Sequence, residues 1–576
     1  MKNNKKEKKN ARKKHKIKLN DEGYIPKAFK KDYTDDLDME EINENLSKKD
    51  FKKLEKSQRK EEKENIALNK KRRRKKKIKK IITITLSIII LITAIKLGIY
   101  THTWKKLAKE MITNENSVVL DTEGKEIAKL GSQKNIDNIS LSSMSPYLKN
   151  AYVAIEDERF YDHSGIDIKR TGGAILSYVT NFGSSSYGGS TITQQLVKNL
   201  TGDSNDSITR KTTEWWKAFQ LETCLSKDEI IEGYLNIIYV GPNIYGVETA
   251  SKYYFSKSAK DLTLEECAFL AGINNSPNSY NPFSDKDNSE KIKKRSKIVL
   301  SKMLELKYIN ESEYNTAVNN IDKGLAFKKG EIKTNEAIYS YHTDSLIPEI
   351  IKDISDKYDI SQTFATNYIE MAGLTIKSTQ DSKIQKQTEV EFEKNKYVLQ
   401  SQNGNDSSQA AMVIIDHKTG YVISCVGGLG EKTSSRPLNR ATQTIRQTGS
   451  AIKPLSVLAP AIDKKIITAS TIYDDTEKDF KDGYHPTNYN PSLGEVTVRR
   501  AVESSQNIPF VEIMEKIKPQ TSIKYLEKMG ITTLTKEDES LVLSLGGLQK
   551  GISPLEMAAR ICNYCKWWAI YRTNIL

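Results

Sequence analysis

Cysteine is scarce in this sequence of 576 residues. Five are present, Cys224, Cys267, Cys425, Cys562 and Cys565. This density excludes a disulfide framework in a chain of this length. Cys562 and Cys565 form one CxxC that has neither a second cysteine pair nor a nearby histidine, so neither a zinc site nor a thioredoxin-type redox site is indicated.

Net charge is absent from most of the chain, although the whole sequence carries a formal charge of +16. Residues 1–80 contain 31 Lys and Arg against 15 Asp and Glu, so they hold the entire excess. This segment is rich in Lys, Glu and Asn and poor in apolar residues, which predicts a mostly disordered basic tail. Such a tail can bind nucleic acid, bind anionic lipid or simply be solvated.

A charge-free apolar run follows the tail. It covers Ile81–Ile95 and extends past Lys96 to Tyr100, and about 20 such residues cross a bilayer core of ~30 Å. The basic cluster Lys71–Lys80 lies on one side only, which predicts a cytoplasmic N-terminus and an extracellular remainder. The run lies far from the N-terminus and is too long for a cleaved signal peptide. We therefore expect a transmembrane helix over 81–100, with the tail against anionic lipids of the inner leaflet rather than against nucleic acid.

The rest of the chain changes pattern several times. Residues 101–145 indicate a stem with strand character, and residues 146–283 have apolar positions at helical spacing. Residues 284–409 are mixed and charged and predict a linker or pedestal. Residues 410–559 are typical of a mixed α/β domain, which starts with a strand, a turn at Lys418–Gly420 and a second strand.

Four segments within the helical region contain the residues best suited to chemistry. They cover 156–165, 188–199, 210–222 and 227–241. They supply two candidate carboxylates, Glu156 and Glu214, and paired carboxylates are typical of chemistry at an anomeric carbon. A base takes the proton of an attacking hydroxyl, and cations stabilise a diphosphate leaving group. Without reference to any protein family, the same charged residues are also consistent with solvent-exposed faces of helices that have no catalytic role.

The four segments closely resemble those of family 51 glycosyltransferases, the lysozyme-like domain of class A penicillin-binding proteins. The second contains GGSTITQQLVKN, whose glycines permit a close backbone approach to a ligand. The downstream GVETASKYYFSK and Leu270-Ala271-Gly272 fit the same family. The resemblance covers about residues 105–283 and implies that the substrate is lipid II, an undecaprenyl-pyrophosphoryl disaccharide-pentapeptide.

The resemblance also implies residue roles. Glu156 is then the general base on the acceptor 4-hydroxyl, and Glu214 organises the donor diphosphate through a basic side chain or a divalent metal. His163 lies in the first segment, where we favour a structural role because Glu156 already supplies the base. The implied substrate-binding residues are Asp157, Phe160, His163, Thr191, Gln195, Lys198, Asn199, Arg210 and Lys211, of which Lys198, Arg210 and Lys211 hold the diphosphate and Thr191, Gln195 and Asn199 line the sugar cleft.

Residues 410–559 resemble the start of a penicillin-binding transpeptidase domain. Ser450 and Lys453 form an SxxK pattern, and positions i and i+3 share a helix face, so Lys453 can lie beside the Ser450 hydroxyl and activate it. Ser505 and Asn507 fit the second motif, SxN. The third motif, a Lys-Thr-Gly after Asn507, is missing, and we interpret Lys418–Gly420 as a decoy in a hairpin turn. We therefore expect no transpeptidation and a poorly folded domain.

The last residues depart from the family. After Ala559 the sequence continues as RICNYCKWWAIYRTNIL, where the family has a stretch such as YA-x-IANGG. Back-translation with chosen codons and a one-nucleotide shift gives EYATIANGGQYIEPIF. We interpret residues 560–576 as an out-of-frame tail, in which Cys562, Cys565, Trp567 and Trp568 have no selected role.

Together these observations predict a multidomain protein. An N-terminal transmembrane helix precedes a mainly α, lysozyme-like glycosyltransferase domain and a partial α/β penicillin-binding (serine β-lactamase-like) domain. The expected function is polymerisation of lipid II into β-1,4 glycan strands at the outer face of the cell membrane. The expected partners are lipid II, the growing glycan strand, the membrane, anionic lipids and, at Ser450, β-lactams. No organic cofactor is expected, and magnesium or manganese remains open. A fully bifunctional synthase, a lytic enzyme and a non-catalytic scaffold are the alternatives.

Overall fold

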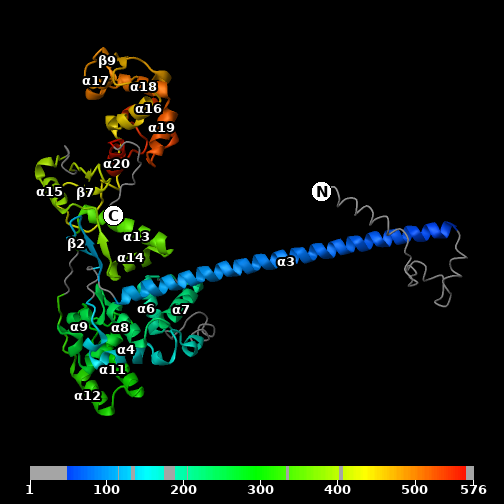
Figure 1. The fold of residues 1–576 in the computed structure, drawn as a ribbon. Coiled ribbons are helices and arrows are strands. Elements are labelled where there is room, and N and C mark those ends of the chain that lie inside the picture. The colour runs from blue at the N-terminus through cyan, green and yellow to red at the C-terminus, as the bar shows by residue number, and fades with distance from the viewer. Residues whose placement is uncertain are drawn as a thin grey trace. The chain divides into compact units, whose positions relative to one another are not determined.

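The structure is a computed structural model that describes residues 48–113, 116–131, 137–173, 189–203, 205, 207–331, 337–400 and 407–565. Gly188, Trp567, Trp568 and most of the basic tail lie outside these residues. The chain divides into two compact units, residues 1–100 and 101–576, with the boundary inside one helix. That helix, α3, runs from Lys48 to Thr113 and is about 100 Å long at 1.5 Å per residue (Figure 1).

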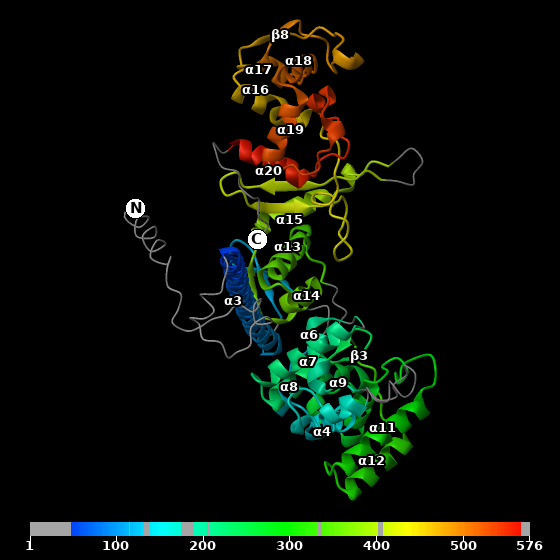
Figure 2. The ribbon, with the colours of Figure 1, turned by 90° about the vertical axis from the view of Figure 1, so that its right-hand side faces the viewer.

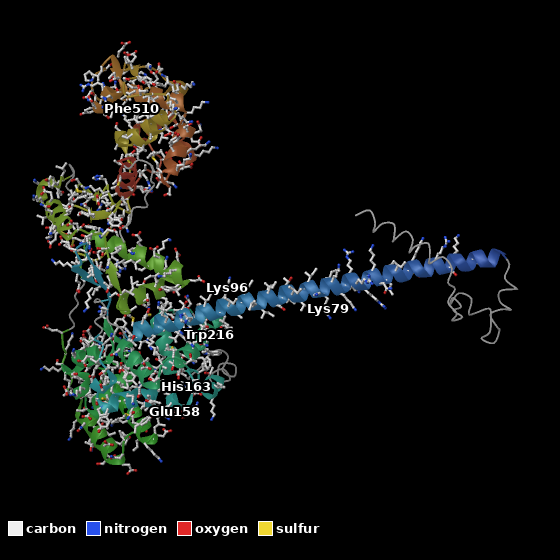
Figure 3. The ribbon with its side chains drawn as sticks, viewed as in Figure 1. Lys79, Lys96, Glu158, His163, Trp216 and Phe510 are labelled. Atoms are coloured by element: carbon white, nitrogen blue, oxygen red, sulfur yellow. The ribbon has the colours of Figure 1, made fainter. Side chains whose placement is uncertain are left out.

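Helix α3 contains the expected apolar segment, which lies between Lys79 and Lys96 in Figure 3. It is long and apolar enough to cross a membrane. The helix begins at Lys48, so residues 48–80 of the tail that we expected to be mostly disordered are helical. This stretch contains no Gly or Pro and is rich in Lys, Glu and Arg, which favour helix. Extending an existing helix costs far less than nucleating one, so the apolar segment supports helix on its N-terminal side.

The helical region forms one core. Trp104, Leu107 and Met111 of α3 are buried in it, so residues 101–113 are helix rather than the predicted stem. Its other helices are α4 (Pro146–Glu156), α6 (Ile192–Thr201), α7 (Ile208–Glu222), α8 (Lys227–Ile237), α9 (Val247–Phe255), α10 (Leu264–Ile273), α11 (Ser289–Glu305) and α12 (Glu311–Lys323). A short hairpin joins β3 (Tyr239–Gly241) to β4 (Ile244–Tyr245).

Two further helices extend this core beyond the predicted boundary at residue 283. Helix α11 packs on α4, α10 and α12, and these helices lie together in Figure 2. Val299, Leu300 and Ile321 are fully buried in the same hydrophobic cluster as α4 and α8. The sequence did not reveal that α11 belongs to this core, because most of its surface is charged and its apolar positions form only a narrow stripe.

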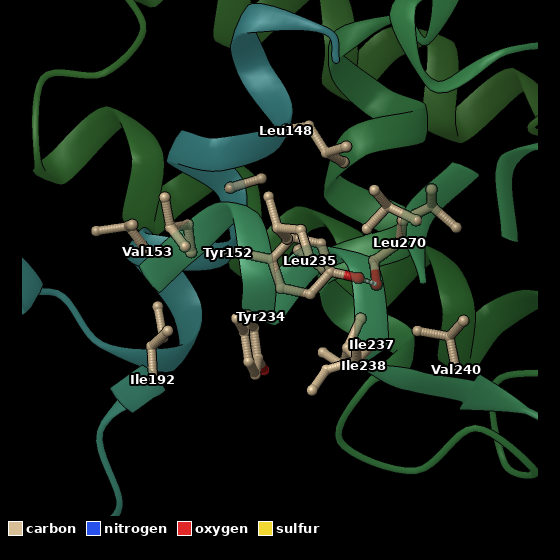
Figure 4. Close-up of a cluster of buried hydrophobic side chains, with 14 of the residues drawn as sticks. Leu148, Tyr152, Val153, Ile192, Tyr234, Leu235, Ile237, Ile238, Val240 and Leu270 are labelled. Atoms are coloured by element: carbon tan, nitrogen blue, oxygen red, sulfur yellow. Dashed lines mark hydrogen bonds between the residues drawn. The ribbon is translucent and has the colours of Figure 1, made fainter. Parts of the chain in front are cut away.

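Two tyrosines lie at the centre of this core. Tyr152 of α4 and Tyr234 of α8 are completely buried and meet edge to face, with ring centroids 6.1 Å apart (Figure 4). Leu148, Leu235 and further aliphatic side chains surround them. The Tyr152 hydroxyl donates to the carbonyl of Leu270 at 2.9 Å, so this buried polar group is satisfied.

A second core contains residues from both the predicted stem (101–145) and the predicted linker or pedestal (284–409). Strand β1 (Val118–Leu120) pairs antiparallel with β2 (Glu126–Lys129) and parallel with β5 (Thr375–Lys377). The strand character expected near residues 118–129 is therefore confirmed. The helices of this part are α13 (Tyr341–Tyr358), α14 (Gln362–Met371) and α15 (Ser382–Phe392). The interval 284–409 is thus divided between two cores rather than being a single linker.

The remaining described residues form the mixed α/β part. Strands β6 (Met412–Ile415) and β7 (Val422–Val426) form the expected hairpin, with Lys418–Gly420 in its turn. Strands β8 (Ile472–Asp474) and β9 (Glu495–Thr497) pair antiparallel. The other elements are the 3-10 helix η6 (Gly449–Ile452), the π-helix η7 (Pro454–Leu458), α16 (Ala459–Asp463), α17 (Val498–Glu503), α18 (Ile508–Ile517), α19 (Pro519–Lys528), the 3-10 helix η10 (Leu541–Leu545) and α20 (Pro554–Cys565).

This part is well packed, contrary to the expectation of a poorly folded domain. Leu455, Phe510, Met514, Leu526 and Leu543 are fully or almost fully buried in one cluster. Phe510 is labelled within these helices in Figure 3. The helices α18 and α19 close over η7, so the segment that contains Lys453 has an apolar core of its own among the described residues.

Candidate active site

Glu156 is the last residue of α4, and its carboxylate is held by two side-chain amides. Gln195 donates from Nε2 to Oε2 at 2.8 Å, and Asn274 donates from Nδ2 to Oε1 at 3.0 Å. The backbone carbonyl of Glu156 accepts a hydrogen bond from Arg170. The carboxylate is partly exposed and retains unshared lone pairs, as a proton acceptor requires.

The next residue, Asp157, is fully buried and connects three segments. Its carboxylate accepts from His163 Nε2 at 3.0 Å and from the backbone N–H of Ile192 at 2.9 Å. His163 Nδ1 accepts from the N–H of Gly165 at 3.1 Å, so the ring proton resides on Nε2. These bonds fix the loop after α4 and the first turn of α6, which fits the structural role favoured for His163.

Gly165 is required at the point where this loop meets α7. Its φ is +85°, and a Cβ here would lie 2.7 Å from the backbone of Ala218. Only glycine accommodates both the left-handed backbone and the close approach. Its carbonyl accepts from the Thr191 hydroxyl at 2.7 Å. The loop 157–165, α6 and α7 are therefore held as one assembly.

Helix α6 begins with a capping bond and connects the two candidate carboxylates. Thr191 is the N-cap, and its hydroxyl accepts from the N–H of Gln194 at 3.1 Å. Gln195 binds Glu156, whereas the neighbouring Gln194 accepts from Lys211 Nζ at 3.3 Å. Lys211 in turn forms an ion pair with Glu214. Glu156 and Glu214 are therefore linked through the first turn of a single helix.

Glu214 lies on α7 and is 5% exposed. It pairs with Arg210 and Lys211, which precede it by four and three residues on the same helix. Lys211 also donates to Ser190 Oγ at 2.9 Å. Lys198 of α6 is exposed and makes no ion pair with a described residue. Arg210 and Lys211 carry two positive charges against the one carboxylate of Glu214, so this cluster keeps one net positive charge, which suits a diphosphate.

Three predicted substrate contacts are too deeply buried for that role. Asp157, Phe160 and Thr191 are fully buried, so they position other groups instead. The Phe160 ring lies under Lys227, whose Nζ is 4.4 Å from the ring centroid. The motif match pointed to these residues, but it could not distinguish a buried residue that positions its neighbours from an exposed residue that contacts the substrate. Gln195 and Asn199 are partly exposed, and their contact with a sugar stays a prediction.

Two residues of the Glu156 environment were missed at the sequence level. Tyr234 lies inside the fourth segment and donates to Gln195 Oε1 at 3.0 Å. Asn274 follows α10 and reaches Glu156 across 118 positions of sequence. No local pattern predicts such a contact, although both residues lie in or beside stretches that had been noted for their resemblance.

The described residues do not provide a preformed donor set for a divalent cation. No group of three or more His, Cys, Asp or Glu side chains among them is arranged to bind a metal. Both oxygens of Glu214 are already bound by cations. Magnesium and manganese prefer several oxygen ligands, so the described residues around Glu214 do not by themselves fit a resident metal.

The second candidate site is centred on Lys453, which is 3% exposed. Its Nζ donates to Asn507 Oδ1 at 2.8 Å, to the Ser505 carbonyl at 2.9 Å and to the Gln506 carbonyl at 3.0 Å. Ser450 is exposed in the 3-10 turn η6, of which it is the second residue. Burial lowers the pKa of Lys453 to about 8, against a smaller opposing effect of Asp475.

Among the described residues the Lys453 ammonium donates to residues 505–507 and not to the Ser450 hydroxyl, and activation of Ser450 by Lys453 stays a prediction. The helix is irregular here, with 3-10 geometry over 449–452 and π geometry over 454–458. A 3-10 turn still keeps residues i and i+3 on one face, so it is the bonds to residues 505–507, and not the local spacing, that direct the Lys453 ammonium elsewhere. The structure does bring Lys453, Ser505 and Asn507 together as the motifs predicted.

The SxN segment is held by a loop that contains Asn488. Asn488 accepts from the N–H of Asn507 at 2.7 Å and donates to the buried Asp475 at 2.9 Å. Ser505 has φ +53°, a left-handed conformation that is uncommon for a residue other than glycine. Such conformations concentrate at functional sites, which supports treating this cluster as a site.

Comparisons with known proteins agree with both sites. Residues 123–304 match the family model described as Transglycosylase, and residues 410–559 match the Penicillin binding protein transpeptidase domain. The chain is 40% identical over 467 residues to Penicillin-binding protein 1A of Clostridium botulinum, covering 77% of this chain and 56% of that protein. It is 37% identical over 493 residues to Penicillin-binding protein 1F of Bacillus subtilis, covering 85% and 65%.

The crystal structure of Penicillin-Binding Protein 1A from Haemophilus influenzae matches with a TM-score of 0.42 and 20% identity, over 78% of this chain and 68% of that one. This likeness is too loose to support an argument. The chain spans little more than half the length of the Clostridium botulinum relative. Two matched domains in this order, together with the relatives, show that the chain belongs to the class A penicillin-binding proteins.

Proposed function

We propose that this chain is a peptidoglycan glycosyltransferase that polymerises lipid II into β-1,4 glycan strands. The observation that carries the proposal is the first turn of α6. Gln195 there binds Glu156, and Gln194 binds Lys211 of the cationic cluster. A base and a diphosphate-binding cluster therefore flank one short segment, as a sugar transfer from a diphosphate donor requires.

The reaction follows from this arrangement. Glu156 accepts the proton of the acceptor 4-hydroxyl while the hydroxyl oxygen forms a bond to C1 of the donor sugar. The bond from C1 to the diphosphate breaks, and its electron pair leaves with the diphosphate. Arg210, Lys211 and Lys198 stabilise the charge that develops there. Attack opposite to the leaving group converts an α-linked donor into a β-linked product.

A lytic activity on finished glycan is the main competing function. Lysozyme-like domains also use a catalytic glutamate, but a hydrolase has no diphosphate to hold. The pairing of Glu214 with Arg210 and Lys211 therefore favours synthesis over cleavage. A non-catalytic scaffold would not need a partly exposed carboxylate held by two amides.

The membrane arrangement forms part of the proposal. Helix α3 crosses the cytoplasmic membrane, its N-terminal side lies in the cytoplasm, and the domains after it lie outside. Nine of the ten residues Lys71–Lys80 are Lys or Arg, and each such charge near an anionic surface contributes about 1 kcal/mol. We therefore assign anionic inner-leaflet lipids, rather than nucleic acid, as the partner of this cluster. β-Lactams are the expected ligands of Ser450.

Polymerisation of lipid II by the detergent-solubilised chain tests the proposed function. Wild-type protein should form glycan strands, and Glu156→Gln should lower the rate by about 10²–10⁴-fold, the usual contribution of a general base. Glu158→Gln is the matched control, because Glu158 is an exposed carboxylate two residues away that forms an ion pair with Lys302. Strand formation by Glu156→Gln at the control rate would contradict the proposal. Release of fragments from finished wall would instead establish the lytic alternative.

A further inference from the structure

The carboxylate of Glu156 belongs to a closed ring of four hydrogen-bonded side chains. Gln195 and Asn274 each donate to one carboxylate oxygen, at 2.8 and 3.0 Å. Asn274 Nδ2 also lies 3.2 Å from the Tyr234 hydroxyl, to which it donates. Tyr234 completes the ring by donating to Gln195 Oε1 at 3.0 Å. The four residues come from α4, α6, α8 and the end of α10.

The direction of every bond in this ring is determined by chemistry. A carboxylate only accepts, so the amide nitrogens of Gln195 and Asn274 must face it. Gln195 then presents its carbonyl oxygen to Tyr234, whose single hydroxyl proton is directed there. The same hydroxyl oxygen accepts from Asn274. Reversing either amide would place an oxygen against the carboxylate, so the ring has one consistent arrangement.

Tyr234 is suited to hold that arrangement. It is fully buried and packs edge to face on Tyr152 (Figure 4). Burial raises the pKa of Tyr234 well above its ordinary value, and the charge of Glu156 raises it further. The hydroxyl therefore remains a donor at every working pH. The rigid Tyr234 hydroxyl orients both amides, since it donates to Gln195 and accepts from Asn274. The two amides leave a free lone pair on each carboxylate oxygen.

We propose that Tyr234 and Asn274 are positioning residues for Glu156, which aim its free lone pair at the acceptor hydroxyl. This inference rests on the proposed glycosyltransferase function. Neither residue touches substrate in this account, because Tyr234 is buried and acts through Gln195 and Asn274. The expected signature is a fall in kcat with little change in KM, since substrate binding does not use the ring.

The test compares two tyrosine variants of the full chain in lipid II polymerisation. Tyr234→Phe removes the ring hydroxyl, and its kcat should fall by about ten-fold or more because a small misplacement of the base is costly. Tyr152→Phe is the matched control, since it removes the hydroxyl of the neighbouring buried tyrosine, which donates only to the Leu270 carbonyl. Its kcat should stay within about two-fold of wild type at a similar loss of thermal stability.

Asn274→Ala provides a second variant that removes the other arm of the ring. It should lower kcat as Tyr234→Phe does. In the double variant, the fold decrease in kcat should be smaller than the product of the two single decreases, because both residues act through one ring. Equal kcat in Tyr234→Phe and Tyr152→Phe would overturn the inference, as would a rise in KM at unchanged kcat. A wild-type chain that forms no strands would overturn the proposed function as well, so the two failures are distinguishable.

Discussion

The two sites of this chain hold a charged group in opposite ways. Glu156 is surrounded by the neutral donors Gln195 and Asn274, each of which uses one lone pair of the carboxylate. Lys453 is surrounded by acceptors, which are the carbonyls of Ser505 and Gln506 and the side chain of Asn507. An ammonium group has three hydrogens to donate, so these three acceptors occupy all of them.

The difference shows which site is arranged to react. Glu156 keeps free lone pairs and is partly exposed, so a substrate hydroxyl finds a proton acceptor already in place. Lys453 donates its hydrogens to residues 505–507, and burial is what makes its neutral form accessible. The glycosyltransferase centre is thus preorganised, whereas the Ser450 centre needs a rearrangement or a proton loss before Lys453 can act as a base.

Apart from the loss of Glu156 itself, removing Glu214 should produce the largest fall in polymerisation. In Glu214→Gln, Arg210 and Lys211 lose their shared carboxylate and no longer point together at a diphosphate. We expect polymerisation to fall by at least about ten-fold, because hydrogen bonds to charged groups contribute ~1.5–3 kcal/mol each. Steady-state kinetics should show this mainly as a higher KM for lipid II.

Glu222→Gln is the control for that experiment. Glu222 is on the same helix and has a similarly buried carboxylate, but it pairs with Lys227 and Thr193 instead. It should lower thermal stability without raising KM. A similar KM for both variants would mean that Glu214 supports only the fold of α7.

Much of the glycosyltransferase site was predictable from sequence. The motif segments located Glu156, Glu214, Arg210 and Lys211, because local spacing on α7 already brings three of them together. Tyr234 and Asn274 were missed, since their contacts with Gln195 and Glu156 exist only after four separate helices pack. Burial of Asp157, Phe160 and Thr191 was missed for the same reason.

A smaller effect concerns penicillin at the second site. Fluorescent penicillin should acylate Ser450 slowly at pH 7, because Lys453 is then mostly protonated and bound by other acceptors. With a pKa of about 8, the neutral fraction of Lys453 rises about ten-fold between pH 7 and pH 9, and the acylation rate should rise with it. Rapid stoichiometric labelling at pH 7, or a rate independent of pH, would contradict this. Ser450→Ala should abolish labelling while polymerisation continues unchanged.

The fold was predictable wherever a single helix or hairpin is encoded by a local sequence pattern. The apolar run of α3 and the β6–β7 hairpin were both read correctly, because charge-free length and strand-turn-strand alternation are local signals. The placement of α11 and of residues 284–409 was not, because their assignment to two cores depends on long-range contacts such as the β1–β5 pairing. The hydrogen-bond partners of Lys453 were not predictable from local spacing either, because they lie 52 to 54 positions further along the chain.

The last effect concerns the pH dependence of folding stability, which we attribute to His342 of α13 and which does not involve either site. Its Nε2–H donates to the Val422 carbonyl at 2.8 Å, and its Nδ1 is buried with no hydrogen-bond partner in the described structure. Burial lowers the pKa of His342 to about 4, partly offset by that hydrogen bond. The unfolded state then binds more protons than the folded state between about pH 6.5 and pH 4. Stability is therefore complete above pH 6.5 and should fall by roughly 2 kcal/mol at pH 5.

Chemical denaturation at pH 7.5 and pH 5 measures this change. His342→Phe should reduce the loss at pH 5, whereas the exposed His417 offers a control, and His417→Gln should retain the full loss. An unchanged acid sensitivity in His342→Phe would show that other groups cause it.

The most direct test of the central claim measures binding and turnover of lipid II in one preparation of Glu156→Gln. If Glu156 only removes a proton, the variant should bind lipid II within about three-fold of wild type and turn it over about 10²–10⁴-fold more slowly. Retained turnover, or a loss of affinity as large as the loss of rate, would contradict the account.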